Sequence, residues 1–86
     1  MSENRLNPEQ ITIYGTKWCP DSRRSQFFFM RKRIPIQFID IDQVPEAEAF
    51  VKEVNQGFRS SPTIVFPDGT ILVEPTDKQL SEKISA

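Results

Sequence analysis

The sequence predicts an α/β domain whose four strands and three helices follow the order β-α-β-α-β-β-α. Two apolar runs rich in β-branched residues, at 11–14 and 36–41, are separated by a segment with helical spacing of apolar residues. A right-handed crossover would place these two strands parallel to each other. A second helical segment and then a hairpin pattern follow, so the four-stranded sheet is expected to be mixed.

The first helix is predicted over residues 20–33. Pro20 suits its first turn, where a missing backbone N–H costs little, and Pro35 ends it. Three apolar residues lie at helical spacing and are expected to face the sheet: Phe27, Met30 and Ile34. At least one of Phe28 and Phe29 should then lie towards the opposite side, either half exposed or covered by the last helix.

The middle of the chain supplies a second strand and a second helix. The largely apolar run at 36–41 suits an interior position in the sheet, parallel to the first strand. Pro45 opens a helix whose apolar residues share one face, namely Ala47, Phe50, Val51 and Val54. Gly57 suits the left-handed cap that ends this helix.

The last third of the chain contains a hairpin and a short helix. Residues 63–66 and 71–73 have strand character and are joined by a Pro-Asp-Gly-Thr turn. The sequence Thr-Asp-Lys-Gln at 76–79 matches the capping-box pattern, which predicts the start of a final helix carrying Leu80 and Ile84.

Length and composition restrict the classes of function. The 86 residues are expected to form one domain at 10–86, preceded by a polar arm at 1–9. A formal charge of −1 gives no reason to expect nucleic acid or an anionic membrane as a partner. No signal-peptide pattern and no apolar run of ~20 residues occurs, so a cytoplasmic protein is expected. The absence of histidine excludes histidine-based metal sites and catalytic dyads, and no metal site is expected.

Cys19 is the only cysteine, so an internal disulfide is excluded. It lies where the first strand meets the first helix, and the positive end of a helix favours the reactive thiolate. Lys17, Arg23 and Arg24 add positive charge nearby, which favours a lower thiol pKa, whereas Asp21 opposes this effect. The position in a polar helix entry favours redox function over a buried structural role.

The sequence Trp-Cys-Pro-Asp-Ser-Arg-Arg at 18–24, preceded by Ile-Thr-Ile-Tyr, resembles the active-site segment of glutaredoxins. The resemblance is greatest to the small glutaredoxin-like branch that includes mycoredoxins. It continues, in order and at the expected spacing, through residues 38–42, 45–47, 54–66, 67–70 and 74–76. It implies a thioredoxin-like (glutaredoxin) fold.

Three departures from the family pattern affect the expected mechanism. Family members usually carry Cys-x-x-Cys, but the second position here is Ser22, either naturally or as an engineered replacement. Ser60 and Ser61 stand where the family usually has Thr-Val. The Gly-Gly pair often found after the last strand is absent.

The resemblance also implies a set of residues around the thiol. The positions matching the family's substrate and thiol-binding residues are Lys17, Trp18, Pro20, Arg59, Ser61, Pro62, Thr76 and Asp77. By resemblance, Lys17 becomes a candidate for holding a carboxylate of the small thiol. The proline matching Pro62 is cis in the family and faces the catalytic sulfur, and the backbone of Ser61 would contact the substrate.

Most of these residues also have a simpler structural explanation. Trp18 fits the lip of a groove or a core position equally well. Lys17 and Arg59 could be solvated charges, and helix capping alone accounts for Thr76 and Asp77.

The predicted function is a glutaredoxin-like thiol–disulfide oxidoreductase that works by a monothiol route. The Cys19 thiolate would attack a mixed disulfide between a protein and a low-molecular-weight thiol, and an external thiol would release it. Ser22 could donate a hydrogen bond to that thiolate but cannot resolve a disulfide. The thiol co-substrate would be glutathione or a mycothiol-like molecule, with no tightly bound cofactor. We expect a monomer, with a Cys19-linked dimer as a product of oxidation.

Two alternatives belong to other functional classes. The chain could be a redox-inactive binding module that keeps the fold and uses the groove to hold a peptide. It could also be a dimeric iron–sulfur carrier, although Pro20 and Asp21 replace the Gly-Phe typical of that group. If the natural residue at position 22 is cysteine, a dithiol route and electron donation to ribonucleotide reductase come into consideration.

Overall fold

The computed structural model describes residues 5–85, and the predicted order of elements is confirmed. Residues 1–4 of the expected N-terminal arm lie outside the described part. The elements are β1 (Ile11–Gly15), α1 (Pro20–Arg31), β2 (Ile36–Asp40), α2 (Pro45–Val54), β3 (Thr63–Val65), β4 (Ile71–Val73) and α3 (Asp77–Ser85). Three elements, α1, β2 and β3, end earlier than the sequence predicts, whereas β1 extends one residue further, to Gly15. Among the described residues, no helix is long and apolar enough to cross a membrane.

The sheet is mixed and has the strand order β2-β1-β3-β4. Strand β1 is parallel to β2 and antiparallel to β3, and β3 and β4 form the antiparallel hairpin. The parallel pairing predicted for β2 is therefore confirmed. Its predicted interior position is wrong, because β2 is an edge strand that pairs with β1 alone. The polar residues Gln37 and Asp40, which interrupt its apolar pattern, fit an edge better than an interior strand.

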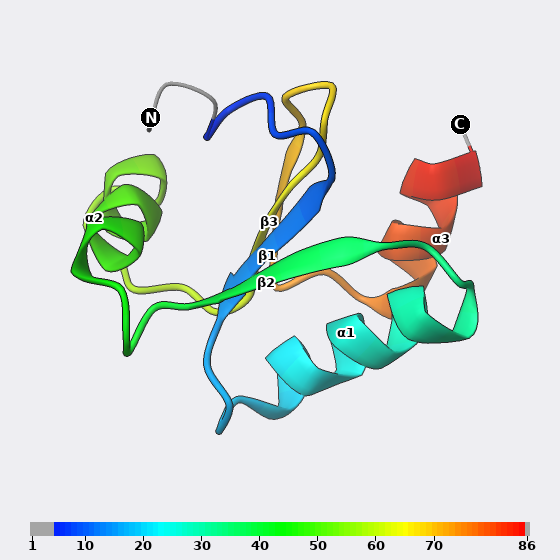
Figure 1. Cartoon of the computed structure of the whole chain (residues 1–86), viewed down its shortest axis with the longest axis horizontal. Helices are drawn as coiled ribbons and strands as arrows, with labels where there is room; N and C mark the ends of the chain where they lie inside the picture. The colour runs from blue at the N-terminus through cyan, green and yellow to red at the C-terminus, as the bar shows by residue number, and fades with distance from the viewer. Residues whose placement is uncertain (1–4, 86) are drawn as a thin grey trace.

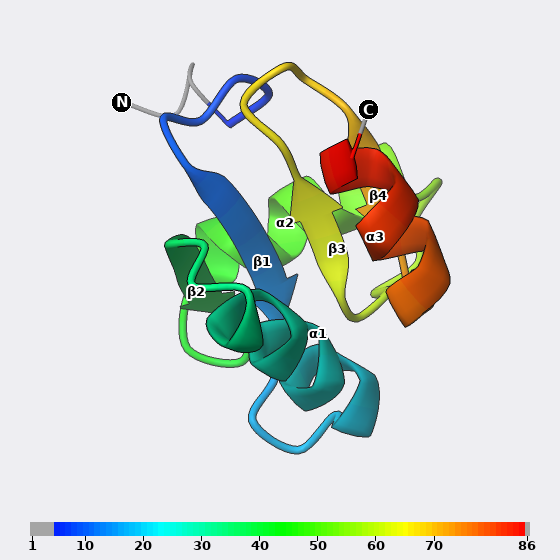
Figure 2. The same cartoon turned by 90° about the vertical axis from the view of Figure 1, so that its right-hand side faces the viewer.

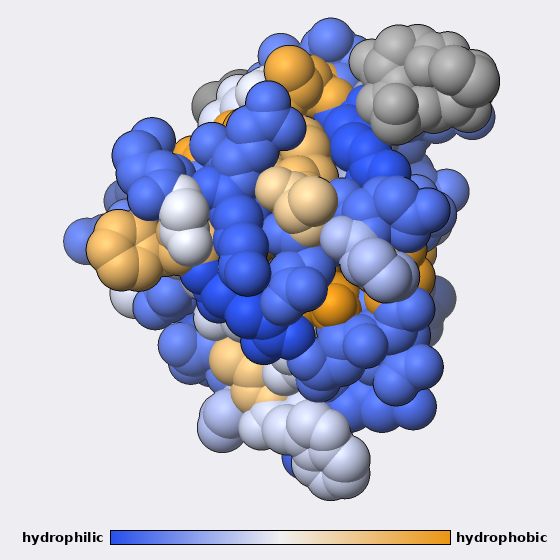
Figure 3. All heavy atoms as spheres, turned by 90° about the vertical axis from the view of Figure 1, so that its left-hand side faces the viewer, coloured by the Kyte–Doolittle hydropathy of each residue, from blue (hydrophilic) through white to orange (hydrophobic). Residues whose placement is uncertain are grey.

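Helices α1 and α3 cover one face of the sheet, and α2 covers the other (Figures 1 and 2). Side chains of a strand alternate between its two faces, and both central strands follow this rule. Ile13 and Ile64 pack under α1 and α3, whereas Tyr14 and Val65 pack with α2. The surface over α2 is mainly hydrophilic, with separate hydrophobic patches (Figure 3).

The aromatic block of α1 is rotated relative to the prediction, although Ile34 packs against the core as predicted. Phe28 and Phe29 are buried in the core with Leu80 of α3. Phe27 and Met30, which were expected to face the sheet, are 49% and 64% exposed. A run of four consecutive apolar residues gives no unique helical phase, and the contact with Leu80 selects Phe28 and Phe29 for burial.

The predicted capping box is confirmed at the start of α3. The side-chain oxygen of Gln79 accepts from the backbone N–H of Thr76 at 2.8 Å, and the backbone N–H of Gln79 donates to the Thr76 hydroxyl at 3.1 Å. At the end of α2, Gln56 and Gly57 both have positive φ. Gly57 therefore occupies the left-handed region expected of a C-terminal cap.

Candidate active site

Cys19 is the N-cap residue of α1 and is half-buried. Its backbone is extended (φ −84°, ψ 116°), and its carbonyl accepts the first helical hydrogen bond, from Arg23 N–H at 3.1 Å. The turn between β1 and α1 therefore places the sulfur beside the unpaired N–H groups of the first helical turn. The thiol lies at the positive end of the helix dipole, as the sequence predicts.

The surroundings of the sulfur favour the thiolate. Burial raises the pKa of Cys19, but hydrogen bonds outweigh burial and bring this pKa below its ordinary value. In order of effect, the groups that lower it are the Ser61 hydroxyl, the Ser22 backbone N–H, the Ser22 hydroxyl and the Asp21 backbone N–H. When protonated, Sγ donates instead to the Ser61 carbonyl oxygen at 3.5 Å. The site therefore has hydrogen-bond partners for both protonation states.

We predict that Cys19 is alkylated with a midpoint pH below that of an ordinary thiol, because only the thiolate reacts. Replacing Ser61 with alanine should move this midpoint upward, because the largest of the pKa-lowering hydrogen bonds is lost. The rate of iodoacetamide alkylation measured against pH tests both statements. The matched control is Ser60→Ala, which should leave the midpoint unchanged. Equal midpoints for Ser61→Ala and the parent protein would contradict the assignment.

Ser22 occupies the position one helical turn after Cys19 and is fully buried. Its hydroxyl lies 2.8 Å from the Ser61 hydroxyl, so the two serines form a hydrogen-bonded pair beside the sulfur. Gly15 makes room for Ser22, because a Cβ atom on Gly15 would overlap Ser22 Oγ and lie 2.9 Å from Ser22 Cβ. The last residue of β1 thus sets how closely α1 approaches the sheet.

Gly15→Ala is expected to lower the free energy of unfolding by about 1–3 kcal/mol, because the added methyl group overfills this contact. Denaturant unfolding measures the change. In a Ser22→Ala background the Oγ overlap disappears, so the same Gly15 substitution should cost less. An equal cost in both backgrounds would contradict the proposed close approach.

The loop that carries Ser61 is tied to the end of α2. The buried side chain of Asn55 donates to Val51 O at 2.8 Å and to the Thr63 hydroxyl at 3.1 Å. The Thr63 hydroxyl in turn donates to Ser60 O at 3.0 Å. The peptide bond between Ser61 and Pro62 is cis, as the resemblance implied, and Pro62 is buried.

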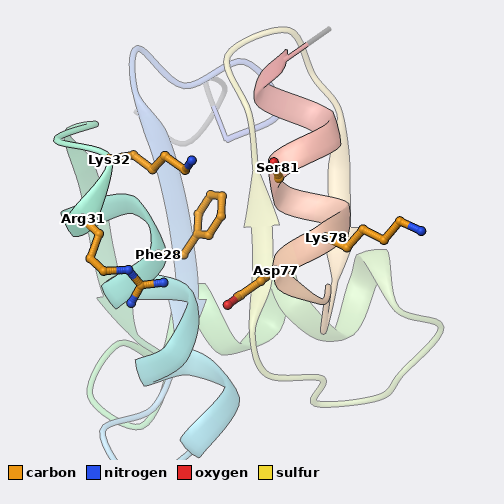
Figure 4. Close-up of a pocket in the computed structure, with 6 residues that line it drawn as sticks. All are labelled: Phe28, Arg31, Lys32, Asp77, Lys78 and Ser81. Carbon is orange, nitrogen blue, oxygen red and sulfur yellow. The ribbon is translucent and has the colours of Figure 1, made fainter.

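Arg24 links α1 to the start of α3. Its guanidinium donates to Asp77 Oδ1 at 2.6 Å and to Pro75 O at 2.8 Å, with a longer contact to Asp21. Thr76 and Asp77 are therefore connected to the helix that Cys19 begins. Figure 4 shows Asp77 at a hollow of about 400 Å³ between the two helices, with Arg31 on the facing side.

The remaining candidate residues divide between the rim of the site and a separate cluster. Lys17, Trp18 and Pro20 are exposed around Cys19, and the 82% exposure of Trp18 rules out the core position considered for it. Arg59 is engaged by two carboxylates, those of Asp42 and Glu48, in the α2 region. Its hydrogen bonds to Glu48 and Asp42 raise its pKa further, and a role in thiol binding stays a prediction.

Comparison with known proteins places this geometry in a family. The family model described as Glutaredoxin matches residues 11–71, a span that includes Cys19, Ser22 and the loop at Ser61. The chain belongs to the glutaredoxin family. Its members are thiol–disulfide oxidoreductases that use glutathione or mycothiol-type thiols as co-substrates.

Relatives and solved structures agree with this assignment. Mycoredoxin 1 of Corynebacterium glutamicum is 39% identical over 79 residues, covering 88% of this chain and 94% of that protein. The crystal structure of glutaredoxin from Archaeoglobus fulgidus superposes with a TM-score of 0.73 at 25% identity, covering 90% of this chain and 87% of that one. The thioredoxin-like fold is therefore confirmed.

The structure also adds residues to the glutaredoxin site that sequence reasoning missed. Gly15 and Asn55 were not identified as residues that support Ser22 and Ser61, and Arg24 was identified only as a nearby charge. A signal existed for Gly15, which stands at the end of β1 shortly before the reactive cysteine. Nothing in the sequence indicates the Asn55–Thr63 contact, because it depends on how α2 docks against β3.

Proposed function

We propose that this glutaredoxin transfers a low-molecular-weight thiol by a monothiol route. The Cys19 thiolate attacks the small-thiol sulfur of a protein mixed disulfide, so a Cys19–S bond forms and the protein sulfur leaves as a thiolate, which takes up a proton. The thiolate of a second small-thiol molecule then attacks the sulfur bound to Cys19. This step releases the symmetric disulfide of the small thiol and regenerates the Cys19 thiolate.

The hydrogen bonding around the single cysteine carries this proposal. The pKa of Cys19 is lowered by Ser61 and Ser22, and the buried hydroxyl of Ser22 occupies the place where dithiol relatives have a resolving sulfur. A hydroxyl can stabilise the thiolate but cannot attack a disulfide. Since an internal disulfide is excluded, release of the mixed disulfide needs an external thiol.

The small thiol would bind along the surface beside Cys19. A carboxylate of the small thiol would contact Lys17. Its amino-acid end would contact the start of α3 at Thr76 and Asp77, through backbone and a side chain, and Ser61 would pair with it through its backbone. The other candidate contacts are Trp18, Pro20, Pro62 and Arg59. The 39% identity to a mycoredoxin supports a mycothiol-like thiol beside glutathione as the co-substrate.

The protein partners of this reaction would be cytoplasmic proteins that carry mixed disulfides. We propose that the enzyme acts as a monomer, because a single turnover needs only one Cys19. A Cys19-linked dimer would form only under oxidation. Residues 10–86 would constitute the catalytic domain, with the polar arm at 1–9 outside it.

Turnover on a preformed mixed disulfide tests the proposal. A model peptide carrying glutathione or mycothiol on its cysteine is incubated with catalytic amounts of protein and excess of the matching thiol. The proposal predicts release of many peptides per protein molecule. The co-substrate is identified as the thiol, glutathione or mycothiol, whose peptide is released faster. Peptide release no faster than the uncatalysed exchange with both thiols would contradict the proposal and support the redox-inactive binding module instead.

A further inference from the structure

The exposed aromatic surface of α1 is left unexplained by the thiol chemistry. Phe27 and Met30 are 49% and 64% exposed, although both are large apolar side chains on a well-packed helix. Phe27 is flanked one turn earlier by Arg23 and one turn later by Arg31, so the three form a single stripe at a spacing of four residues. Contiguous apolar surface with a polar rim indicates an interaction site.

Two adjoining hollows share this stripe. One, of about 440 Å³, lies between α1 and strand β2 and is lined by Phe27, Met30 and Phe38 with Lys17 and Arg23. The other, of about 350 Å³, runs along α1 past Phe27 from Pro20 to Arg31. We name the combined surface the Phe27 groove, with Phe27, Met30 and Phe38 as its floor and Lys17, Arg23 and Arg31 as its rim.

The charge of the Phe27 groove has one sign. No carboxylate lines either hollow within the described residues. Of the cations there, Arg24 is neutralised by its contacts with Asp77 and Asp21. No salt bridge is formed by Lys17, Arg23 or Arg31 in the part of the chain that the structure describes. Three cations thus surround an apolar floor.

Each hollow of the groove extends to a residue close to Cys19 in the chain. Lys17 precedes Cys19 by two residues and Pro20 follows it directly, so each hollow reaches the helix entry that holds the thiol. Strand β2 is the sheet edge, which leaves the groove open on that side to an incoming chain. A polypeptide whose disulfide lies at Cys19 can therefore extend into the groove.

We propose that the Phe27 groove binds an acidic, apolar segment of the protein substrate next to its disulfide. The proposal rests on the proposed function, because the segment belongs to the protein that Cys19 attacks. Apolar side chains would cover Phe27 and Met30, and carboxylates would pair with Arg23 and Arg31. A second copy of this chain is a poor occupant, because a symmetric contact would bring the same cations together.

Two short peptides test the assignment, one with Leu and Glu around a central cysteine and one with Leu and Lys. Their cysteine-to-serine forms report binding alone through the fluorescence of Trp18, the only tryptophan. The acidic peptide should bind more tightly than the basic one, and Arg31→Glu and Phe27→Ser should each weaken it by on the order of 10-fold at low salt. Lys52→Glu is the matched control, since Lys52 is the last-turn cation of α2 as Arg31 is of α1.

The same peptides as glutathione mixed disulfides separate this assignment from the enzyme proposal. Glutathione transfer that is faster from the acidic peptide than from the basic one would support both proposals, provided that Arg31→Glu abolishes this preference and Lys52→Glu keeps it. Binding without transfer would overturn the enzyme proposal and leave the groove assignment standing. Equal binding of the two peptides, or binding that Phe27→Ser does not weaken, would overturn the groove assignment. So would a dimer in sedimentation that Phe27→Ser dissociates, because the occupant would then be a second copy.

Discussion

Cys19→Ser is expected to reduce turnover on mixed disulfides by on the order of 10³-fold or more while leaving the fold intact. The loss follows from the chemistry, because a serine hydroxyl is not ionised near neutral pH and Cys19 is the only thiol in the chain. The residue is an N-cap that makes no side-chain capping hydrogen bond. Serine is a preferred N-cap residue, so the variant should be as stable as the parent or up to about 1 kcal/mol more stable.

Two measurements on Cys19→Ser test this prediction, one of stability and one of turnover. Thermal unfolding of Cys19→Ser should show no loss of stability, which excludes misfolding as the cause of inactivity. Turnover in the peptide assay should fall to the uncatalysed rate. Retention of even a tenth of the parent turnover would show that another group performs the chemistry.

Ser22→Cys is expected to change the product that forms when the protein reacts with glutathione disulfide. Ser22 lies one helical turn after Cys19, and its hydroxyl contributes to lowering the pKa of the Cys19 thiol, so a thiol at this position would lie within reach of a mixed disulfide on Cys19. The new thiolate would attack Cys19 Sγ, form an internal disulfide and expel the small thiol. After reaction with glutathione disulfide, the parent should carry one glutathionyl group, whereas Ser22→Cys should carry none and have lost two hydrogens.

Intact mass spectrometry distinguishes these products directly. Ser25→Cys is the matched control, because Ser25 is equally buried but lies one turn further along α1. Its thiol should not resolve the adduct on Cys19, so the glutathionyl group should persist. A stable glutathionyl adduct on Ser22→Cys would contradict the placement of residue 22 beside the reactive sulfur.

The sequence predicted the parts of this molecule that depend on local order. Strand and helix order, the helix entry at Cys19 and the capping box at Thr76 each rest on residues close together in the chain. The orientation of the aromatic block could not be predicted, because consecutive apolar residues at 27–30 allow several helical phases. Packing against Leu80, which is distant in sequence, selects the phase.

The candidate site also depends on contacts between residues far apart in the chain. Ser22 and Ser61 could be named from their motifs, but their hydrogen bond joins residues far apart in the chain and required the fold. The pairing of Arg59 with Asp42 and Glu48 likewise arises from the docking of loops around α2. The edge position of β2 could have been predicted from the polar residues Gln37 and Asp40. The interior position was predicted instead because the other residues of this strand are Ile and Phe.

The most direct test of the central claim compares the thiol of Cys19 in the folded and the unfolded chain. Reduced protein is mixed with glutathione disulfide near neutral pH, with and without urea, and intact mass is followed over time before excess thiol is added. A lowered pKa and a preorganised site predict that the folded protein acquires a single adduct faster than the unfolded chain. Excess thiol should then remove the adduct from the folded protein. Equal rates in both states, or an adduct that excess thiol does not remove, would contradict the assignment of Cys19 as a catalytic nucleophile.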